Sequence, residues 1–262
     1  MNPYLFCAGV AVCVFVSGAI GLQLQRSLPE GHTTGRPGDM IDAVVGLMTL
    51  LLALVLGLLI WTAFGVFSTQ KASIQTLAIN ALRFDSALLE FGPEADRGRE
   101  ILKAGLQRMI THIWSESSDG GIVARSFGYA VFDLKEREDF LETLKPSSDR
   151  QKSAQAQAME AAAAIGQTRS QMAVAMVDPV SYPLISVVAA WAAFLFCGFG
   201  LLSTSHVMSY VALAVGALAV ASACYVIIDL SAPYSGLFQV SSEAITEVID
   251  TIELTSKSVH HH

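Results

Sequence analysis

The sequence has little charge and few of the patterns that mark enzymes. Only 15% of its 262 residues are charged and 53% are hydrophobic, whereas about 25% of residues are charged in typical soluble proteins. It contains no glycine-rich phosphate loop, no histidine pair at helical ligand spacing and no cysteine cluster. These absences predict a protein that is not an enzyme and that holds neither a cofactor nor a metal ion.

Basic residues are also scarce. Lys and Arg number 16 against 23 Asp and Glu, which gives a net charge of −7, and no basic cluster suits nucleic acid or anionic lipid headgroups. The four cysteines lie inside apolar runs, where they act as small packing residues, so no disulfide framework is predicted. Residues 260–262, all histidine, resemble the remnant of a purification tag.

What the sequence does have is four long apolar runs. Residues 42–67 suffice to cross a hydrocarbon core of roughly 30 Å. The run 3–24 is longer than the apolar part of a signal peptide and no cation precedes it, so it is interpreted as a spanning helix. The runs 184–202 and 210–230 are separated by a short loop and predict a transmembrane hairpin. The fold class is therefore an all-α membrane protein with four transmembrane helices, the first two joined by a loop over 25–41.

Most of the charge lies in residues 68–179, which predict a helical cytosolic domain between the second and third spans. The second span continues into this domain without a proline and predicts one helix from Asp42 to Phe91. Its apolar residues recur at alternating steps of three and four, the pattern of a coiled-coil seam. We expect this seam to bind copies of itself or the alanine-rich helix predicted over 150–177. The seam residues are Ile74, Leu77, Ala81, Phe84, Leu88 and Phe91.

Shorter helices are predicted around this long one. Gly92-Pro93 ends it, and an apolar stripe from Leu102 to Trp114 predicts a helix that packs antiparallel on it. A turn-rich break follows at 115–121. The stretch 122–132 alternates only partly and is interpreted as a helix, with a second, separate helix over 133–144.

The carboxyl end, 231–259, begins with a turn and continues as an amphipathic helix. Its apolar residues recur on one side between 241 and 253. This tail is expected to lie either near the membrane or on the cytosolic domain.

Two stripes of small residues occur in the spans. In the first span, residues 9, 13, 17 and 21 fall four apart, which suits a pore wall or close helix packing. In the second span, Thr49, Ala53, Gly57 and Trp61 have the same spacing. They either line a narrow hydrophobic pore at an oligomer axis, which gates by dewetting, or form the surface on which the first helix packs.

Asp229 ends the fourth span, where the helix dipole and the loss of water both oppose a carboxylate. It requires a cation or hydrogen-bond donors, and Lys71, at the same predicted membrane level, is the candidate partner. A structural ion pair and an ion site are both compatible with this position.

Three segments resemble the bestrophin-like group of bacterial and plant membrane proteins: Leu88-Leu-Glu-Phe-Gly-Pro-Glu-Ala95, Trp191-Ala-Ala-Phe-Leu-Phe-Cys-Gly-Phe-Gly200, and Asp229-Leu-Ser-Ala-Pro-Tyr-Ser-Gly236 followed by Val240-Ser-Ser242. The resemblance implies four helices arranged as in the oligomeric bestrophin anion channels, with both termini and the large insert in the cytosol. It implies no established activity. The chain lacks an acidic cluster after the fourth span like the calcium clasp of animal bestrophins, so calcium gating is not expected.

Charge alone orients the protein weakly. Lys71, Arg83 and Arg169 lie near the proposed inner ends, against Arg26 and Arg36 at the outer mouth. With the resemblance, these residues predict a multi-pass protein of the cell inner (plasma) membrane that forms a homo-oligomeric, anion-conducting ion channel. The alternative is a non-conducting scaffold or sensor whose cytosolic helices bind a partner protein.

Overall fold

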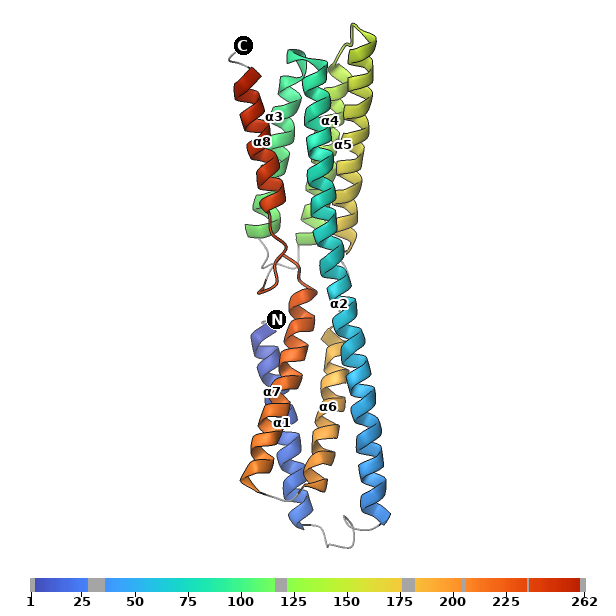
Figure 1. Ribbon diagram of the computed structural model, residues 1–262, viewed down its shortest axis with the longest axis vertical. Helices are drawn as coiled ribbons and strands as arrows, with labels where there is room; N and C mark the ends of the chain where they lie inside the picture. The colour runs from blue at the N-terminus through green and yellow to red at the C-terminus, as the bar shows by residue number, and fades with distance from the viewer. Residues whose placement is uncertain are drawn as a thin grey trace. The chain divides into compact units, whose positions relative to one another are not determined.

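The computed structural model describes residues 3–27, 36–115, 122–175, 182–203, 206–234 and 236–259. Within these ranges every regular element is a helix, and four helices are long and apolar enough to cross a membrane (Figure 1). This confirms the prediction of an all-α membrane protein. The chain divides into two compact units. We name Met1–Gly65 with Val180–Ser231 the membrane unit, and Val66–Pro179 with Ala232–His262 the helical unit.

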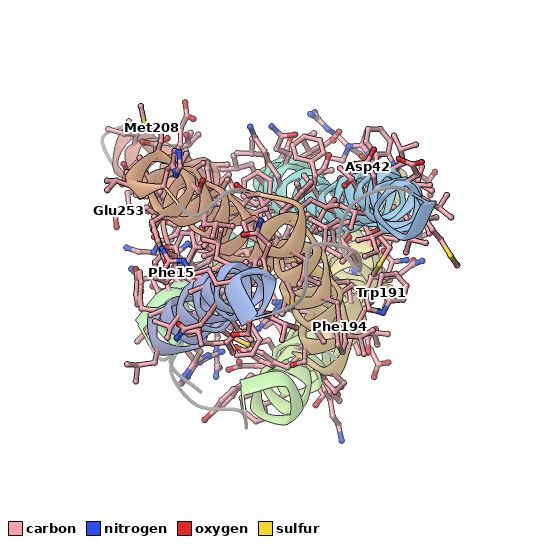
Figure 2. The ribbon with its side chains drawn as sticks, turned by 90° about the horizontal axis from the view of Figure 1, so that it is seen from below. Phe15, Asp42, Trp191, Phe194, Met208 and Glu253 are labelled. Carbon is pink, nitrogen blue, oxygen red and sulfur yellow. The ribbon has the colours of Figure 1, made fainter. Side chains whose placement is uncertain are left out.

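The membrane unit contains α1 (Pro3–Ser27), the first part of α2 (Arg36–Phe91), α6 (Tyr182–Leu202) and α7 (Val207–Leu230). Helix α1 packs against both α6 and α7. Helix α6 lies between α1 and α2, and Figure 2 shows Phe15 of α1 and Asp42 of α2 on different sides of it. The first two spans are therefore not packed on each other within one chain.

The predicted loop at 25–41 is shorter than expected. Helix α1 continues to Ser27, and α2 begins at Arg36. Pro37 does not prevent this early start, because the first turn of a helix tolerates proline. Asp39 lies in the same turn, where a carboxylate is favoured by the helix dipole. Residues 28–35 lie outside the described part of the chain.

Helices α1 and α6 approach closely because glycines face each other. A Cβ on Gly21 would overlap the carbonyl oxygen of Cys197, and one on Gly200 would overlap the carbonyl oxygen of Gly18. Beside this contact the hydroxyl of Ser17 donates a hydrogen bond of 2.7 Å to the carbonyl oxygen of Ala193. Small residues thus permit backbone contact between spans, as is common in membranes.

The small-residue stripe of α1 serves packing along only half of its length. Ser17 and Gly21 contact α6, whereas Gly9 and Cys13 are exposed and a Cβ on Gly9 would meet nothing within 4 Å. Of the two interpretations of this stripe, helix packing therefore applies to its carboxyl-terminal half.

The helical unit contains the rest of α2, the 3₁₀ turn η2 (Pro93–Ala95), α3 (Asp96–Ile110), the π-helical turn η3 (Thr111–Ser115), α4 (Ile122–Thr143), α5 (Asp149–Ala175) and α8 (Glu243–Val259). Helix α2 runs unbroken from the membrane unit to Phe91, as predicted. It ends because Gly92 adopts a φ of 118°, which other residues rarely adopt, and Pro93 then starts η2.

The apolar seam of α2 is buried inside the helical unit, where all six of its residues belong to the hydrophobic core. Polar contacts along its length show that α5 runs antiparallel beside it. The Nε2 of Gln151 donates to the carbonyl oxygen of Phe91 over 3.0 Å, and the Nε2 of Gln70 donates to that of Met172 over 3.2 Å. Of the two predicted partners for this seam, the structure therefore has α5 of the same chain.

Helix α4 corrects the prediction of separate helices over 122–132 and 133–144. It is one helix from Ile122 to Thr143. Gly128 lowers helix stability by about 1 kcal/mol relative to alanine but does not end a helix. The charged residues that follow do not interrupt the helix either. Two of them, Asp133 and Arg137, are buried in the unit. The predicted break at 115–121 falls largely on residues outside the described part.

Helix α8 packs on the helical unit, which decides between the two positions expected for the tail. Its Ile245, Val248, Ile249 and Ile252 belong to the core. Helix α8 is also bound by Arg99 of α3. The Nη2 of Arg99 donates to the carbonyl oxygen of Ile252 over 3.3 Å and to the hydroxyl of Thr255 over 2.8 Å.

Candidate functional site

The candidate pore stripe lies on an uncovered surface of α2. Thr49, Ala53 and Gly57 are exposed, and Trp61 is 73% exposed. A Cβ on Gly57 would meet no atom within 4 Å. The stripe is therefore not a surface on which α1 packs within the chain.

A different set of residues attaches α2 to the membrane unit. Val45, Leu52, Leu59 and Ala63 are buried, and Val45 occupies the space that a Cβ on Gly198 of α6 would need. In the most apolar window of each candidate span, 17% of the residues of α2 are buried, compared with 33% for α1, 33% for α6 and 39% for α7. Among the candidate spans in the described part, α2 is thus the least covered by its own chain.

The stripe offers little polarity to an ion. The hydroxyl of Thr49 donates to the carbonyl oxygen of Val45 over 2.7 Å, and that of Thr62, which follows Trp61 and lies beside the stripe, donates to the carbonyl oxygen of Leu58 over 2.6 Å. Both hydroxyl hydrogens are thus used within the helix. A passage along this surface would be lined mainly by apolar groups, which suits a hydrophobic constriction.

The predicted mouth residues lie at helix ends. Arg26 is exposed in the last turn of α1, and Arg36 is the first residue of α2, its side chain outside the described part. Asp229 is 6% exposed at the end of α7, where its carboxylate interacts with the hydroxyl of Tyr225 one turn earlier. Lys71 is exposed and belongs to the helical unit. The pairing of Asp229 with Lys71 stays a prediction.

A buried polar network lies in the helical unit where the chain arrives from α7. The hydroxyl of Tyr234 donates to Oε1 of Gln70 over 2.7 Å, and its ring meets the indole of Trp114 edge to face, with the centroids 5.3 Å apart. The Nε1 of Trp114 donates to the carbonyl oxygen of Val240 over 2.8 Å, and the amide of Val240 donates to that of Pro233 over 2.8 Å. Burial raises the pKa of the Tyr234 hydroxyl. This network joins the segment after α7 to α2 and to the turn after α3.

The sequence did not predict this network. Tyr234 and Val240 lie in segments that carry the family resemblance, whereas Gln70 and Trp114 were not assigned to it. Gln70 carries a usable signal, because it stands four residues before Ile74 at the next seam position, where an apolar residue is usual.

A second polar group is a charged cluster between α3, α4 and α5. Both carboxylate oxygens of Asp133 are engaged: Oδ1 accepts from Nη2 of Arg108 over 2.8 Å, and Oδ2 accepts from Nη1 of Arg169. The Nη2 of Arg108 also donates to Glu136 over 2.8 Å. Arg137 lies in the same cluster and is only 2% exposed. Burial, and secondarily the charge of Arg169, lower the pKa of Arg137 to about 10, so it is charged at neutral pH.

The chain matches a known protein family. Residues 12–245 match a family model described as a bestrophin-like domain. No curated protein and no solved structure matches the chain.

Proposed function

The chain belongs to the bestrophin-like family, and we propose that copies of it assemble in the cell inner membrane as an ion channel whose pore is lined by α2. The observation that carries the proposal is the uncovered surface of α2. Its small-residue stripe is exposed in the single chain, and its apolar window is the least buried of the four candidate spans that the described residues contain. In an assembly of copies around an axis, that surface would border the axis.

The residue sizes along the stripe favour a narrow passage. Ala53 and Gly57 have minimal side chains, and Trp61 adds a single large ring one turn further. Because the threonine hydroxyls bond their own helix, the passage would close by losing water rather than by a ring of charges. Ion preference would then come from the mouths.

We propose that the channel prefers anions and that the helical unit and both termini face the cytosol. Arg26 and Arg36 would supply positive charge at the outer mouth, and Lys71 at the inner one. Such charges raise the local concentration of anions and are screened by salt.

Liposome flux of purified protein tests this function. We expect chloride flux in the wild type, loss of flux in Gly57→Trp, and a lower ratio of chloride to potassium flux in Arg36→Glu. The matched control is Ala219→Trp, the same kind of change at an exposed small residue of α7. Equal block by both tryptophans would contradict a pore lined by α2.

A groove in the helical unit favours the second candidate, a non-conducting scaffold that binds a partner protein. It measures about 320 Å³, lies between α2 and α5, and combines polar side chains with a floor of alanines. Its lining residues are Asn80, Arg83, Ser86, Ala87, Gln157, Glu160, Ala161 and Ala164. Absence of chloride and potassium flux from an intact oligomer would favour this candidate.

A further inference from the structure

The charged cluster between α3, α4 and α5 has one positive charge more than its acids can balance. Among the described residues it holds three guanidinium groups and two carboxylates. Arg108 and Arg169 take up the hydrogen-bonding positions on Asp133, and Arg108 also takes Glu136. Arg137 is the third guanidinium, for which the described part of the cluster holds no further carboxylate.

The guanidinium of Arg137 is buried with unused donors. Its Nε and Nη2 are inaccessible to solvent and have no hydrogen-bond partner in the described part of the chain. Arg137 is also the largest fully buried side chain there. Buried charges in proteins are ordinarily paired, because an unpaired one loses its water without compensation. The arrangement therefore calls for an acceptor, preferably one with negative charge.

Space beside the cluster limits the size of that acceptor. Gly105 of α3 faces the cluster, and a Cβ there would lie 3.4 Å from Nη1 of Arg137 and 3.7 Å from Cγ of Asp133. The Nε and Nη2 of Arg137 are themselves closed off from solvent. An acceptor beside them would have to be enclosed by protein, which suits a monatomic ion rather than a phosphate or a nucleotide.

We propose that the helical unit binds one small inorganic anion, with chloride as its representative, between α3, α4 and α5, where the Nε and Nη2 of Arg137 donate hydrogen bonds to it. The bound ion balances the third guanidinium and stabilises the packing of α4 on its neighbours. This site is separate from the proposed pore, and it does not require that the protein conducts.

Thermal unfolding of the purified full-length protein in detergent tests the site. Sodium chloride is compared with sodium gluconate at equal ionic strength, because gluconate is too large to be enclosed beside Arg137. We expect chloride at ten times its Kd to raise the Tm by about 3–6 °C, since a ligand that binds only the folded state stabilises it by mass action. Equal Tm values in the two salts at up to molar concentration would overturn the proposal.

Two variants assign the effect to the cluster. Arg137→Met removes the guanidinium whose Nε and Nη2 lack partners while keeping a long side chain, and Arg137→Lys keeps the positive charge but removes both of these donors. Both should lose most of the chloride-dependent rise, whereas the control Arg150→Met, at an exposed ion pair with Glu90, should keep it. If Arg137→Met does not fold, Arg137→Lys carries the test. An unchanged chloride effect in Arg137→Lys and in any folded Arg137→Met would show that the ion binds elsewhere.

Discussion

The hydroxyl of Tyr234 donates a hydrogen bond to the side-chain oxygen of Gln70, and both residues are buried in the helical unit. Tyr234 follows the last span, and Gln70 lies on α2 just beyond the candidate pore segment. The Nε2 of the same Gln70 side chain donates to Met172 of α5. One glutamine thus ties the segment after α7 to two long helices of the unit.

Tyr234→Phe should destabilise the protein, because it leaves the buried oxygen of Gln70 without its donor. We expect a loss of about 1–3 kcal/mol in the free energy of unfolding. Thermal or denaturant unfolding of the purified protein measures it. Tyr129→Phe is the control, since the Tyr129 side chain is partly exposed and stacks on His112 through its ring. Equal stability of Tyr234→Phe and wild type would contradict the importance of this bond.

The same tyrosine predicts a pH dependence. Burial raises the pKa of Tyr234 above the value of about 10 expected in the unfolded chain. The folded state therefore retains its proton more strongly, and this contribution to stability is complete below pH 10 and is lost as pH rises above it. Tyr234→Phe should show a shallower fall in Tm above pH 10 than wild type. Identical slopes for the two proteins would argue against the burial of this hydroxyl.

Gly21→Ala should disrupt the membrane unit, whereas Gly9→Ala should not. Both positions lie on α1, but a Cβ on Gly21 would overlap the backbone of Cys197 while one on Gly9 would meet open space. Overpacking of this kind costs about 1–3 kcal/mol. Monodispersity and Tm in detergent measure the difference. If both variants behave like wild type, the close contact of α1 with α6 is wrong.

Phe84→Ala tests the seam of α2. Phe84 is fully buried in the core, so truncation should cost about 3–5 kcal/mol or prevent folding, and Phe84→Asp should prevent folding. Leu82→Ala is the control on an exposed face of the same helix and should change the stability by less than about 0.5 kcal/mol. Similar yields and Tm values for the two alanine variants would contradict the burial of the seam.

The seam of α2 could be predicted from the sequence, whereas the contacts of the buried polar groups could not. Apolar spacing is a local property, so the four spans and the unbroken α2 could be predicted from neighbouring residues. The partner of Gln70 could not, because Tyr234 lies far away in the sequence and the pair forms only after folding. Residues 133–144 likewise predict only a short separate helix, because the sequence does not reveal that Asp133 meets arginines of α3 and α5.

The proposed orientation predicts which sites a membrane-impermeant thiol reagent reaches. In a background without the four native cysteines, single cysteines at Gln157 of α5 and Thr251 of α8 should label only from the cytosolic side. A cysteine at Met40, exposed near the start of α2, should label only from the outside. Labelling of the Met40 and Gln157 positions from one side would contradict the topology.

The pairing of Asp229 with Lys71 predicts energetic coupling between the end of α7 and α2. Asp229 is buried at a helix end whose dipole disfavours a carboxylate, so a nearby cation would stabilise it. Asp229→Asn and Lys71→Met should each lower the Tm, and the swap Asp229→Lys with Lys71→Asp should recover part of the loss. A double-mutant cycle should give a coupling energy of about 0.5–3 kcal/mol, while Asp250→Asn, an exposed acid of α8, serves as the control. If Asp229→Asn and Lys71→Met have purely additive effects, Asp229 is held by groups of its own unit and Lys71 is free to serve the proposed inner mouth.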